Sequence, residues 1–262
     1  MFAASRKDEL CQELIKNKSL SVKEMAERLH VTEETIRRDI KVLENEGIAE
    51  KTHGGAILKS SVMTLFSNYE HKKILVENKK AMAQIAAQYA KNNMCIFIDS
   101  STSAFEVVPF LSDKNLTLVS NALDVITYCA TTPNIRLICP GGEYNDKFGY
   151  FFGSQALDAL EYMNFDLAIM SCRTAGIQSG FCEGIREQTD IKRLVCKHSS
   201  KIITILDHTK LDKTSFVKTM DIDDTDVFIT DLPLSPSWKE YLDKQKVEYR
   251  IASEELPAFN FL

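Results

Sequence analysis

Two adjacent arginines stand in residues 32–40, TEETIRRDI, where their spacing could serve DNA recognition. At 100° per residue, a helix over this segment places Ile36, Ile40 and Leu43 on one side. The opposite side then carries the polar residues Glu34, Arg37, Arg38, Lys41 and Asn45. A guanidinium group pairs with a guanine edge through two hydrogen bonds, and it also binds phosphate. Alone, the pattern is more typical of an ordinary solvated helix face, so its meaning depends on the neighbouring elements.

Polar residues also follow the ends of five apolar runs farther along the chain. The first such segment holds Asp99, Ser100, Ser101, Thr102 and Ser103 ahead of an expected helix. The other segments hold Asn121, Gly141, Gly142, Arg173 and Lys210. Hydroxyls, cations and backbone N–H groups together suit a small phosphorylated sugar, and glycines let the backbone approach a ligand closely. Because turns favour the same residue types, only the convergence of five segments predicts a ligand site.

Three short helices are expected ahead of residue 48. Residues 5–17 have apolar side chains at helical spacing, and a break follows them. Ser21 and Glu24 form a capping box at the start of a second helix. Thr32 can cap a third helix, which we expect to end at Gly47.

A hairpin is expected after the third helix. His53, Gly54 and Gly55 stand between two short apolar pieces, which is typical of two strands joined by a tight turn. Three helices and a hairpin predict a winged helix-turn-helix, with the third helix as recognition helix and the hairpin as wing. We therefore expect a DNA-binding domain over residues 1–58 and a linker over 59–70.

The rest of the chain, residues 71–262, alternates short apolar runs with helical patterns. The runs cover residues 94–98, 116–119, 135–139, 167–170, 202–206 and 227–229, and the helical patterns fall near 71–91, 103–112, 122–131, 154–162, 185–198 and 236–244. Strands of this length separated by helices predict an α/β domain with a parallel sheet that is covered on both faces. Ligands of such sheets bind beyond the carboxyl ends of the strands, where the polar segments lie.

Charge and composition narrow the class of protein. The chain has 262 residues and a net charge of −5. Residues 1–60 hold eleven basic and eleven acidic residues, so DNA binding must come from a local basic face.

The seven cysteines form no CxxC pair, which favours reduced thiols in a cytoplasm over a zinc site. No apolar run has the length of a membrane span, and the N-terminus lacks a signal-peptide core. The sequence has no Walker loop, and no GxGxxG motif follows the first strand, which argues against nucleotide binding. We expect no cofactor.

The chain resembles the DeoR family of bacterial transcription repressors. In the N-terminal part the resemblance covers Arg6, Leu10, Leu14, Thr35, Ile36, Arg37, Arg38, Asp39, Ile40, Leu43, Glu44, Gly47, His53, Gly54, Gly55 and Ala56. In the rest it covers Asp99, Ser100, Thr102, Ser120, Asn121, Gly141, Gly142, Gly153, Asp166, Gly176, Glu187, Asp207 and Lys210. The resemblance implies a sheet related to ribose-phosphate isomerases that serves as a sugar-phosphate sensor.

Two residues depart from the pattern of the family. Ser101 stands where glycine is usual, and Arg173 stands where a smaller residue is common. Arg173 fits either a phosphate ligand or the partner of a carboxylate such as Glu183.

The expected function is that of a repressor of a carbohydrate-utilisation operon, controlled by a phosphorylated sugar. The residues expected to contact double-stranded operator DNA are Ser21, Thr32, Glu34, Thr35, Arg37, Arg38, Lys41, His53 and Gly54. The residues expected to bind the sugar phosphate are Asp99, Ser100, Ser101, Thr102, Ser103, Asn121, Gly141, Gly142, Arg173, Glu187 and Lys210. Asp39 is expected to orient an arginine or cap locally, since phosphates repel its charge. One helix and one wing give little surface for tight binding, so we expect a homo-oligomer, either a dimer or a tetramer.

Two other classes of function stay open from the sequence. In an isomerase-like enzyme with an accessory N-terminal domain, Asp99, Glu187 and Asp207 could transfer protons near a sugar phosphate. In a binding module, the N-terminal helices would only dimerise the chain. Turnover of sugar phosphates would identify the enzyme, and failure to retain any DNA would identify the module.

Overall fold

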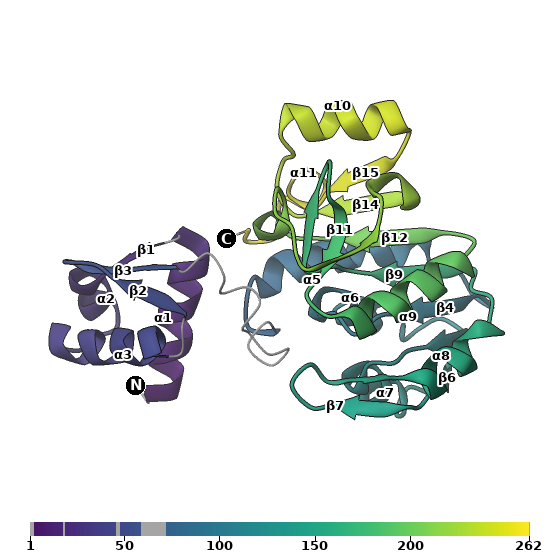
Figure 1. The fold of residues 1–262 in the computed structure, drawn as a ribbon, viewed down its shortest axis with the longest axis horizontal. Helices are drawn as coiled ribbons and strands as arrows, with labels where there is room; N and C mark the ends of the chain where they lie inside the picture. Colours follow the sequence, from purple (N-terminus) through teal and green to yellow (C-terminus); the bar gives the residue numbers. More distant parts are fainter. Residues whose placement is uncertain (1–2, 18, 46–47, 59–71, 262) are drawn as a thin grey trace. The chain divides into compact units, whose positions relative to one another are not determined.

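The computed structural model describes residues 3–17, 19–45, 48–58 and 72–261. The chain forms two compact units, Met1–Ile74 and Leu75–Leu262 (Figure 1). The expected linker over residues 59–70 and the expected helix end at Gly47 lie outside the described residues.

The N-terminal unit contains three helices and a small sheet. Its elements are α1 (Ala3–Asn17), β1 (Ser19–Ser21), α2 (Val22–Arg28), α3 (Glu33–Asn45), β2 (Ala49–Lys51) and β3 (Gly55–Leu58). The predicted apolar face of α3 is confirmed, because Ile36, Ile40 and Leu43 are buried. They share the core with Leu10 and Leu14 of α1, which are also buried.

Side chains cap α2 and α3 at the predicted residues. The Ser21 hydroxyl accepts a hydrogen bond from the Glu24 backbone N–H at 3.4 Å, and the Thr32 hydroxyl accepts one from the Thr35 N–H at 3.3 Å. Each cap satisfies a backbone donor that the first helical turn leaves without a partner. The two hydroxyls therefore fix where the helices of the helix-turn-helix begin.

The predicted wing is confirmed, and it belongs to a three-stranded antiparallel sheet of order β1-β3-β2. Strand β1 was not expected, because the residues before Ser21 suggested a break rather than a strand. Its backbone passes so close to β3 that a Cβ atom on Gly55 would lie 1.8 Å from the Leu20 carbonyl oxygen. Gly55 is therefore required by the packing of the wing.

The C-terminal unit is built on a seven-stranded parallel sheet of order β15-β14-β12-β9-β4-β5-β6. The strands are β4 (Cys95–Ile98), β5 (Leu116–Val119), β6 (Ile135–Ile138), β9 (Leu167–Met170), β12 (Ile202–Ile205), β14 (Val227–Thr230) and β15 (Glu248–Ile251). The first six correspond to the six predicted runs. The seventh, β15, lies at an edge of the sheet and has the sequence EYRI, which offers no apolar run.

Helices cover both faces of this sheet. They are α5 (Val76–Ala86), α6 (Thr102–Phe105), α7 (Leu123–Cys129), α8 (Ser154–Glu161), α9 (Arg186–Lys197), α10 (Pro236–Gln245) and α11 (Ala252–Glu255), with the 3-10 turns η2 (Ala87–Tyr89), η3 (Val108–Leu111), η4 (His208–Lys210) and η5 (Ile222–Asp224). Side chains alternate between the faces, so Ile96 and Ile98 enter one core and Phe97 enters the other. The first core includes residues of α5, α6, α7 and α11, and the second includes residues of α8, α9 and α10.

Two small antiparallel sheets were not predicted. One pairs β7 (Glu143–Asn145) with β8 (Tyr150–Phe152), and the other has the order β10-β11-β13, formed by Thr174–Gly176, Gly180–Glu183 and Val217–Met220. Their strands are short and mix polar with apolar residues, so they show neither an apolar run nor a long alternation. Both sheets add backbone around the ends of the large sheet.

The order of the strands reverses between β4 and β9. The chain runs from β4 through β5 to β6 in one direction, and from β9 through β12 and β14 to β15 in the other. In open α/β sheets, the loops diverge at such a switch point and leave a crevice at the carboxyl ends of the strands. The loops after β4 and β9 are therefore the first place to look for a ligand site.

Candidate functional site

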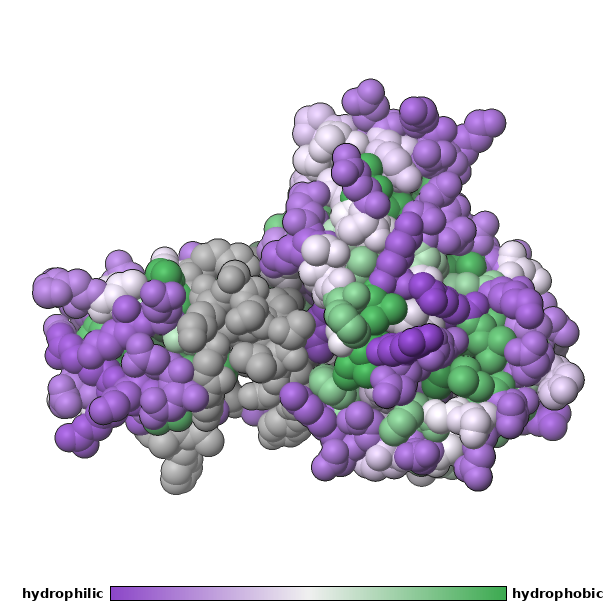
Figure 2. Space-filling view, in the orientation of Figure 1, coloured by the Kyte–Doolittle hydropathy of each residue, from purple (hydrophilic) through white to green (hydrophobic). Residues whose placement is uncertain are grey.

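The outward face of α3 carries the charged residues that the sequence placed there. Arg37, Arg38 and Lys41 are exposed, and so is Glu34. The face of the N-terminal unit seen in Figure 2 is predominantly hydrophilic. The predicted division of α3 into an apolar and a charged side is confirmed, whereas the DNA contacts of these residues stay a prediction.

Each arginine of α3 pairs with a carboxylate one helical turn earlier. The Arg37 Nη2 atom lies 2.6 Å from Glu33 Oε2, and the Arg38 Nε atom lies 3.6 Å from Glu34 Oε1. All four side chains are at least 47% exposed, so water screens both pairs and each contributes little to stability. The arginines are therefore held only loosely and can move to another partner.

Asp39 orients an arginine, as predicted, and that arginine is Arg6 of α1. Arg6 Nε donates to Asp39 Oδ2 at 2.5 Å, and Arg6 Nη2 donates to Asp39 Oδ1 at 3.1 Å. The side chains are only 11% and 14% exposed, so this bidentate pair is shielded from solvent far better than those of Arg37 and Arg38. It ties the recognition helix to α1.

The remaining candidates for DNA contact lie on the helix caps and the wing. Thr32 and Thr35 join their hydroxyls at 2.9 Å at the start of α3. His53 and Gly54 are exposed in the turn of the wing, and the Gly54 carbonyl accepts a hydrogen bond from the Val22 N–H at 2.9 Å. This bond connects the wing turn to the start of α2, next to the Ser21 cap.

At the switch point, Asp99 joins the two halves of the large sheet. Its carboxylate accepts hydrogen bonds from the Ser101 N–H at 3.0 Å, from the Ser101 hydroxyl at 2.6 Å and from the Ser171 N–H at 3.1 Å. Asp99 follows β4 and Ser171 follows β9, so one buried side chain links the loops that diverge there. Ser101 has an extended backbone with φ of −76° and its hydroxyl caps α6, which explains why the loop does not need the glycine usual in the family.

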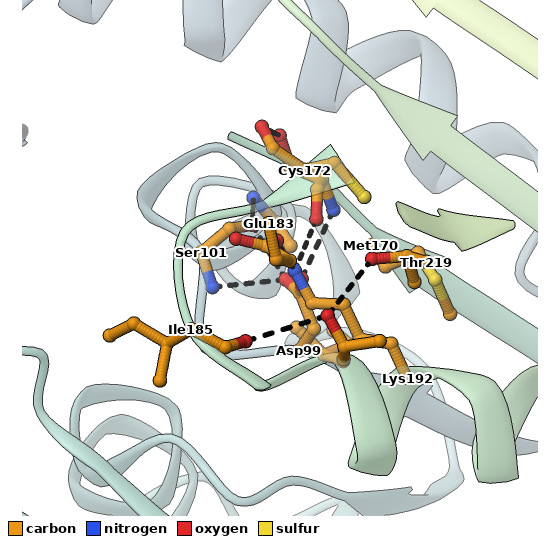
Figure 3. Close-up of polar contacts among 12 residues, drawn as sticks. Asp99, Ser101, Met170, Cys172, Glu183, Ile185, Lys192 and Thr219 are labelled. Carbon is orange, nitrogen blue, oxygen red and sulfur yellow. Dashed lines mark hydrogen bonds and ion pairs between the residues drawn. The ribbon is translucent and has the colours of Figure 1, made fainter. Parts of the chain in front are cut away.

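A buried lysine of α9 completes this cluster. Figure 3 shows Lys192 between the side chains of Asp99 and Glu183. Its Nζ atom lies 2.9 Å from Asp99 Oδ2, forms an ion pair with Glu183, and donates to the Ser171 carbonyl oxygen at 2.5 Å. Burial alone lowers the pKa of Lys192, but the carboxylates of Asp99 and Glu183 outweigh it and raise the pKa well above its usual value. Lys192 is therefore a fixed cation between the side chains of Asp99 and Glu183.

A second group of charges lies at the end of β12. Lys210 Nζ donates to the Ser171 hydroxyl at 3.2 Å and lies 3.6 Å from Asp207 Oδ2. Burial favours the neutral acid, but Lys210 and other nearby donors hold the pKa of Asp207 below its usual value. Ser171 contacts Asp99 as well as Lys210, so the structure brings these two predicted ligand residues to one place.

Lys79, in the first turn of α5, belongs to the same group of charges. It is buried, and burial together with the positive charge of Lys210 lowers its pKa to about 7. The carboxylates of Asp207 and Glu106 act in the opposite direction. An anion placed near Lys79 and Lys210 would favour the charged form of both lysines.

A buried carboxylate, Asp231, connects α5 with the loop that carries Lys210. It accepts hydrogen bonds from Asn78 Nδ2 at 2.7 Å and from the His208 N–H at 2.7 Å, and it lies 2.8 Å from His208 Nδ1. Asn78 precedes Lys79, and His208 follows Asp207. Asp231 therefore fixes the two segments that bring Lys79 and Lys210 together.

Asn121 and Gly142 lie where the β7–β8 hairpin meets the sheet. Asn121 Nδ2 donates to the Phe151 carbonyl oxygen at 2.9 Å, while Asn121 Oδ1 is buried without a hydrogen-bond partner. The expectation that Gly142 serves close approach to a ligand has a structural alternative, because a Cβ atom there would lie 2.3 Å from the Phe152 carbonyl oxygen. Gly141 and Gly142 both have positive φ, so the turn before the hairpin requires glycine whether or not a ligand binds.

The other predicted ligand residues differ in exposure. Ser100, Thr102 and Ser103 are buried after β4, and the Ser103 hydroxyl has no hydrogen-bond partner. Burial lowers the pKa of Arg173, and the negative charge of Glu183 acts in the opposite direction. The carboxylate of Glu183 itself pairs with Lys192. Glu187 is exposed in the first turn of α9.

Sequence reasoning missed four residues of this site: Lys79, Ser171, Lys192 and Asp231. A signal was present for both lysines. Lys79 lies three positions before Met82 and seven before Ala86, on the apolar side of α5. Lys192 lies three positions before Val195, on the apolar side of α9. A lysine on the apolar side of a helix indicates a buried charge that needs a partner. Asp231 and Ser171 gave no such signal, because each simply follows a strand.

The part of the chain that the structure describes contains neither a helix suited to span a membrane nor a group of side chains suited to bind a metal ion. None of the helices described combines the length and the apolar character that crossing a bilayer requires. Among the same residues, no three His, Cys, Asp or Glu side chains are grouped so that they could hold a metal ion.

Family comparisons cover both units. A family model described as "DeoR-like helix-turn-helix domain" matches residues 6–62, and one described as "DeoR C terminal sensor domain" matches residues 74–232. Together they span the recognition helix, the wing and the strand-end cluster.

Curated relatives match over almost their whole length. The HTH-type transcriptional regulator GolR of Listeria innocua is 30% identical over 93% of this chain and 96% of its own. The glycerol-3-phosphate regulon repressor of Escherichia coli is 27% identical over 91% of this chain and 95% of its own. The L-fucose operon activator of Haemophilus influenzae is 26% identical over 87% of this chain and 91% of its own.

Solved structures that match include ribose 5-phosphate isomerases. The enzyme from Plasmodium falciparum is 18% identical, with a TM-score of 0.38 over 51% of this chain and 52% of its own. A D-ribose-5-phosphate isomerase in complex with phospho-erythronic acid is 13% identical, with a TM-score of 0.40 over 66% of each chain.

Proposed function

Because the chain belongs to the DeoR family of helix-turn-helix transcriptional regulators, we propose that it represses a carbohydrate-utilisation operon under the control of a phosphorylated sugar. The family is non-enzymatic, which removes the isomerase-like alternative. The helix-turn-helix domain implies DNA binding and the sensor domain implies a small-molecule effector. The class of effector and its site are what we propose.

The observation that carries the proposal is the pair of buried lysines, Lys79 and Lys210, at the strand ends. Burial, together with repulsion from Lys210, lowers the pKa of Lys79 to about 7, and an anion placed beside the two lysines would stabilise their charged forms. The segment of residues 99–103 supplies hydroxyls, which suit the hydroxyl groups of a sugar. One curated relative is named for the glycerol-3-phosphate regulon and another for the L-fucose operon, so these relatives are named for the regulation of carbohydrate-related genes.

On the DNA side, we propose that α3 enters a major groove. Arg37 or Arg38 reads bases, and Lys41 with the hydroxyls of Thr32 and Thr35 contacts phosphates. The wing at His53 reaches a neighbouring groove or the backbone. Because a single unit offers little surface, we propose a homo-oligomer, a dimer or a tetramer, on repeated operator half-sites.

The effector proposal can be tested by thermal unfolding of the whole chain with a panel of phosphorylated sugars. The chain has a single tryptophan, Trp238, in α10, so its fluorescence follows the C-terminal unit. A true effector at 100 times its Kd stabilises the fold by about 2.7 kcal/mol, and the parent sugar without phosphate does not. Equal stabilisation by the unphosphorylated sugars would overturn the proposal.

Lys210→Met tests the site itself. The variant loses a cation that we assign to the phosphate, so the stabilisation should vanish while binding to DNA stays unchanged. Lys244→Met is the matched control, because Lys244 is exposed on α10 in the same unit. If Lys210→Met keeps the full stabilisation by a sugar phosphate, the effector binds elsewhere.

A further inference from the structure

The outward face of α3 holds carboxylates at the end where a recognition helix usually contacts bases. The helix carries four acidic residues, Glu33, Glu34, Asp39 and Glu44, against the three basic residues Arg37, Arg38 and Lys41. Asp39 is engaged by Arg6 of α1. Glu33 and Glu34, in the first turn, are therefore the acidic groups nearest to both arginines.

Each of the two glutamates faces one of the arginines, Arg37 and Arg38, of which we assign one or the other to base reading. Arg37 reaches Glu33 at 2.6 Å and Arg38 reaches Glu34 at 3.6 Å, each across one helical turn. The two pairs leave this end of the face without net charge. It therefore attracts the phosphates of an arbitrary duplex less than two unpaired arginines would.

Binding to DNA breaks these weak pairs and leaves two carboxylates near the groove. On an operator, guanine edges can take the arginines and a carboxylate can accept a hydrogen bond from the amino group of cytosine. On an arbitrary sequence these contacts are missing, and phosphates repel the carboxylates. The amount by which the two glutamates weaken the free energy of DNA binding thus depends on the sequence of the DNA.

We propose that Glu33 and Glu34 are specificity-determining residues that weaken binding to DNA other than the operator. The inference rests on the proposed insertion of α3 into a major groove. It goes further in assigning the discrimination to two acidic residues rather than to the arginines alone.

The test compares the full-length chain with Glu33→Gln/Glu34→Gln on a fluorescent 30-base-pair duplex of random sequence, by anisotropy between 50 and 300 mM KCl. Removing two repelled charges should tighten binding roughly 10-fold at 50 mM KCl and make the slope of log K against log salt steeper by up to about 1.8. Glu33→Asp/Glu34→Asp keeps the negative charge on shorter side chains and should stay near the wild-type affinity. Far-UV circular dichroism confirms that each variant keeps its helices.

Glu9→Gln is the matched control for bulk charge. It removes one negative charge from α1 of the same unit, where Glu9 lies 3.9 Å from Arg28 and Arg28 keeps its closer partner, Glu13, at 2.6 Å. Unchanged affinity and slope in the double Gln variant, or an equal gain per charge in Glu9→Gln, would overturn the inference alone. If neither the wild type nor the double variant binds the duplex at 50 mM KCl, the inference is overturned, and the proposed DNA binding is overturned with it only if the wild type also enriches no duplex from a random-sequence pool.

Discussion

Lys79 and Lys192 are both buried at the strand ends, and their surroundings move their pKa values in opposite directions. Lys192 has two carboxylates around it, which raise its pKa well above the usual value. Lys79 faces Lys210, and burial with this repulsion lowers its pKa to about 7. Lys192 is thus a structural cation, whereas Lys79 can gain a proton when an anion arrives.

The lowered pKa of Lys79 makes the stability of the chain depend on pH. Between about pH 7 and pH 10.5 the unfolded chain holds a proton on Lys79 that the folded chain lacks, so stability rises with pH there. Relative to Lys79→Met, the free energy of unfolding of the wild type should increase by roughly 1 kcal/mol per pH unit from pH 7 to 9. Urea unfolding at pH 7, 8 and 9 measures the difference.

Lys80→Met is the control for this prediction. Lys80 is the next residue, but its side chain is 43% exposed and pairs with Glu77. Its substitution should leave the pH dependence of the wild type unchanged. Parallel stability profiles for the wild type and Lys79→Met would show that Lys79 stays charged in the folded chain.

Part of the site could be predicted from single residues and part could not. Asp99, Ser101 and Lys210 were expected because they follow apolar runs, and the structure connects them through Ser171. Lys192 lies 93 positions after Asp99, so only the fold reveals the pairing of these two residues. The close approach of the Phe152 backbone to Gly142 could not be foreseen for the same reason, since Phe152 belongs to an unexpected strand, and the role of Gly142 in ligand binding stays a prediction.

At the scale of elements, the wing depends on the close approach of β1 and β3. In Gly55→Ala, the new methyl group would lie 1.8 Å from the Leu20 carbonyl oxygen, so one strand must shift. Overpacking of this kind costs about 1–3 kcal/mol. The midpoint of urea unfolding followed by far-UV circular dichroism should fall accordingly.

Gly54→Ala offers a control one residue away. A Cβ atom there meets no atom within 4 Å, and the stability should change by less than about 0.5 kcal/mol. Equal stability of both variants would mean that the wing absorbs the added methyl group.

Elements with a continuous apolar run or a clear helical period were the predictable ones. Strands β5 and β9 match the expected runs residue for residue because both faces of the sheet are covered. Strands β11 and β15 were missed, since GFCE and EYRI mix polar and apolar residues. Such strands form because a neighbouring backbone supplies hydrogen bonds, a tertiary effect that local sequence does not encode.

At the scale of the whole molecule, each unit has a core of its own, so the units can be followed separately. Asp39→Asn breaks the shielded pair with Arg6 and should destabilise the N-terminal unit by about 1–3 kcal/mol. In urea unfolding, we expect a lower midpoint when the transition is followed by circular dichroism. The midpoint followed by Trp238 fluorescence should stay unchanged, because Trp238 is buried in the C-terminal unit. Glu44→Gln, on the same helix but exposed, should move neither midpoint. A shift of the Trp238 transition in Asp39→Asn would mean that the two units unfold together.

The switch point also has a consequence for the order of folding. Strands β4, β5 and β6 follow one another in the chain and pair as neighbours, and so do β9, β12, β14 and β15. The pairing of β4 with β9 instead closes a loop of about 70 residues, and long loops are slow to close. We therefore expect the two halves of the sheet to form first and their junction last. Asp99, Ser171 and Lys192 meet only at that junction, so the contacts among them cannot form before β4 and β9 have paired.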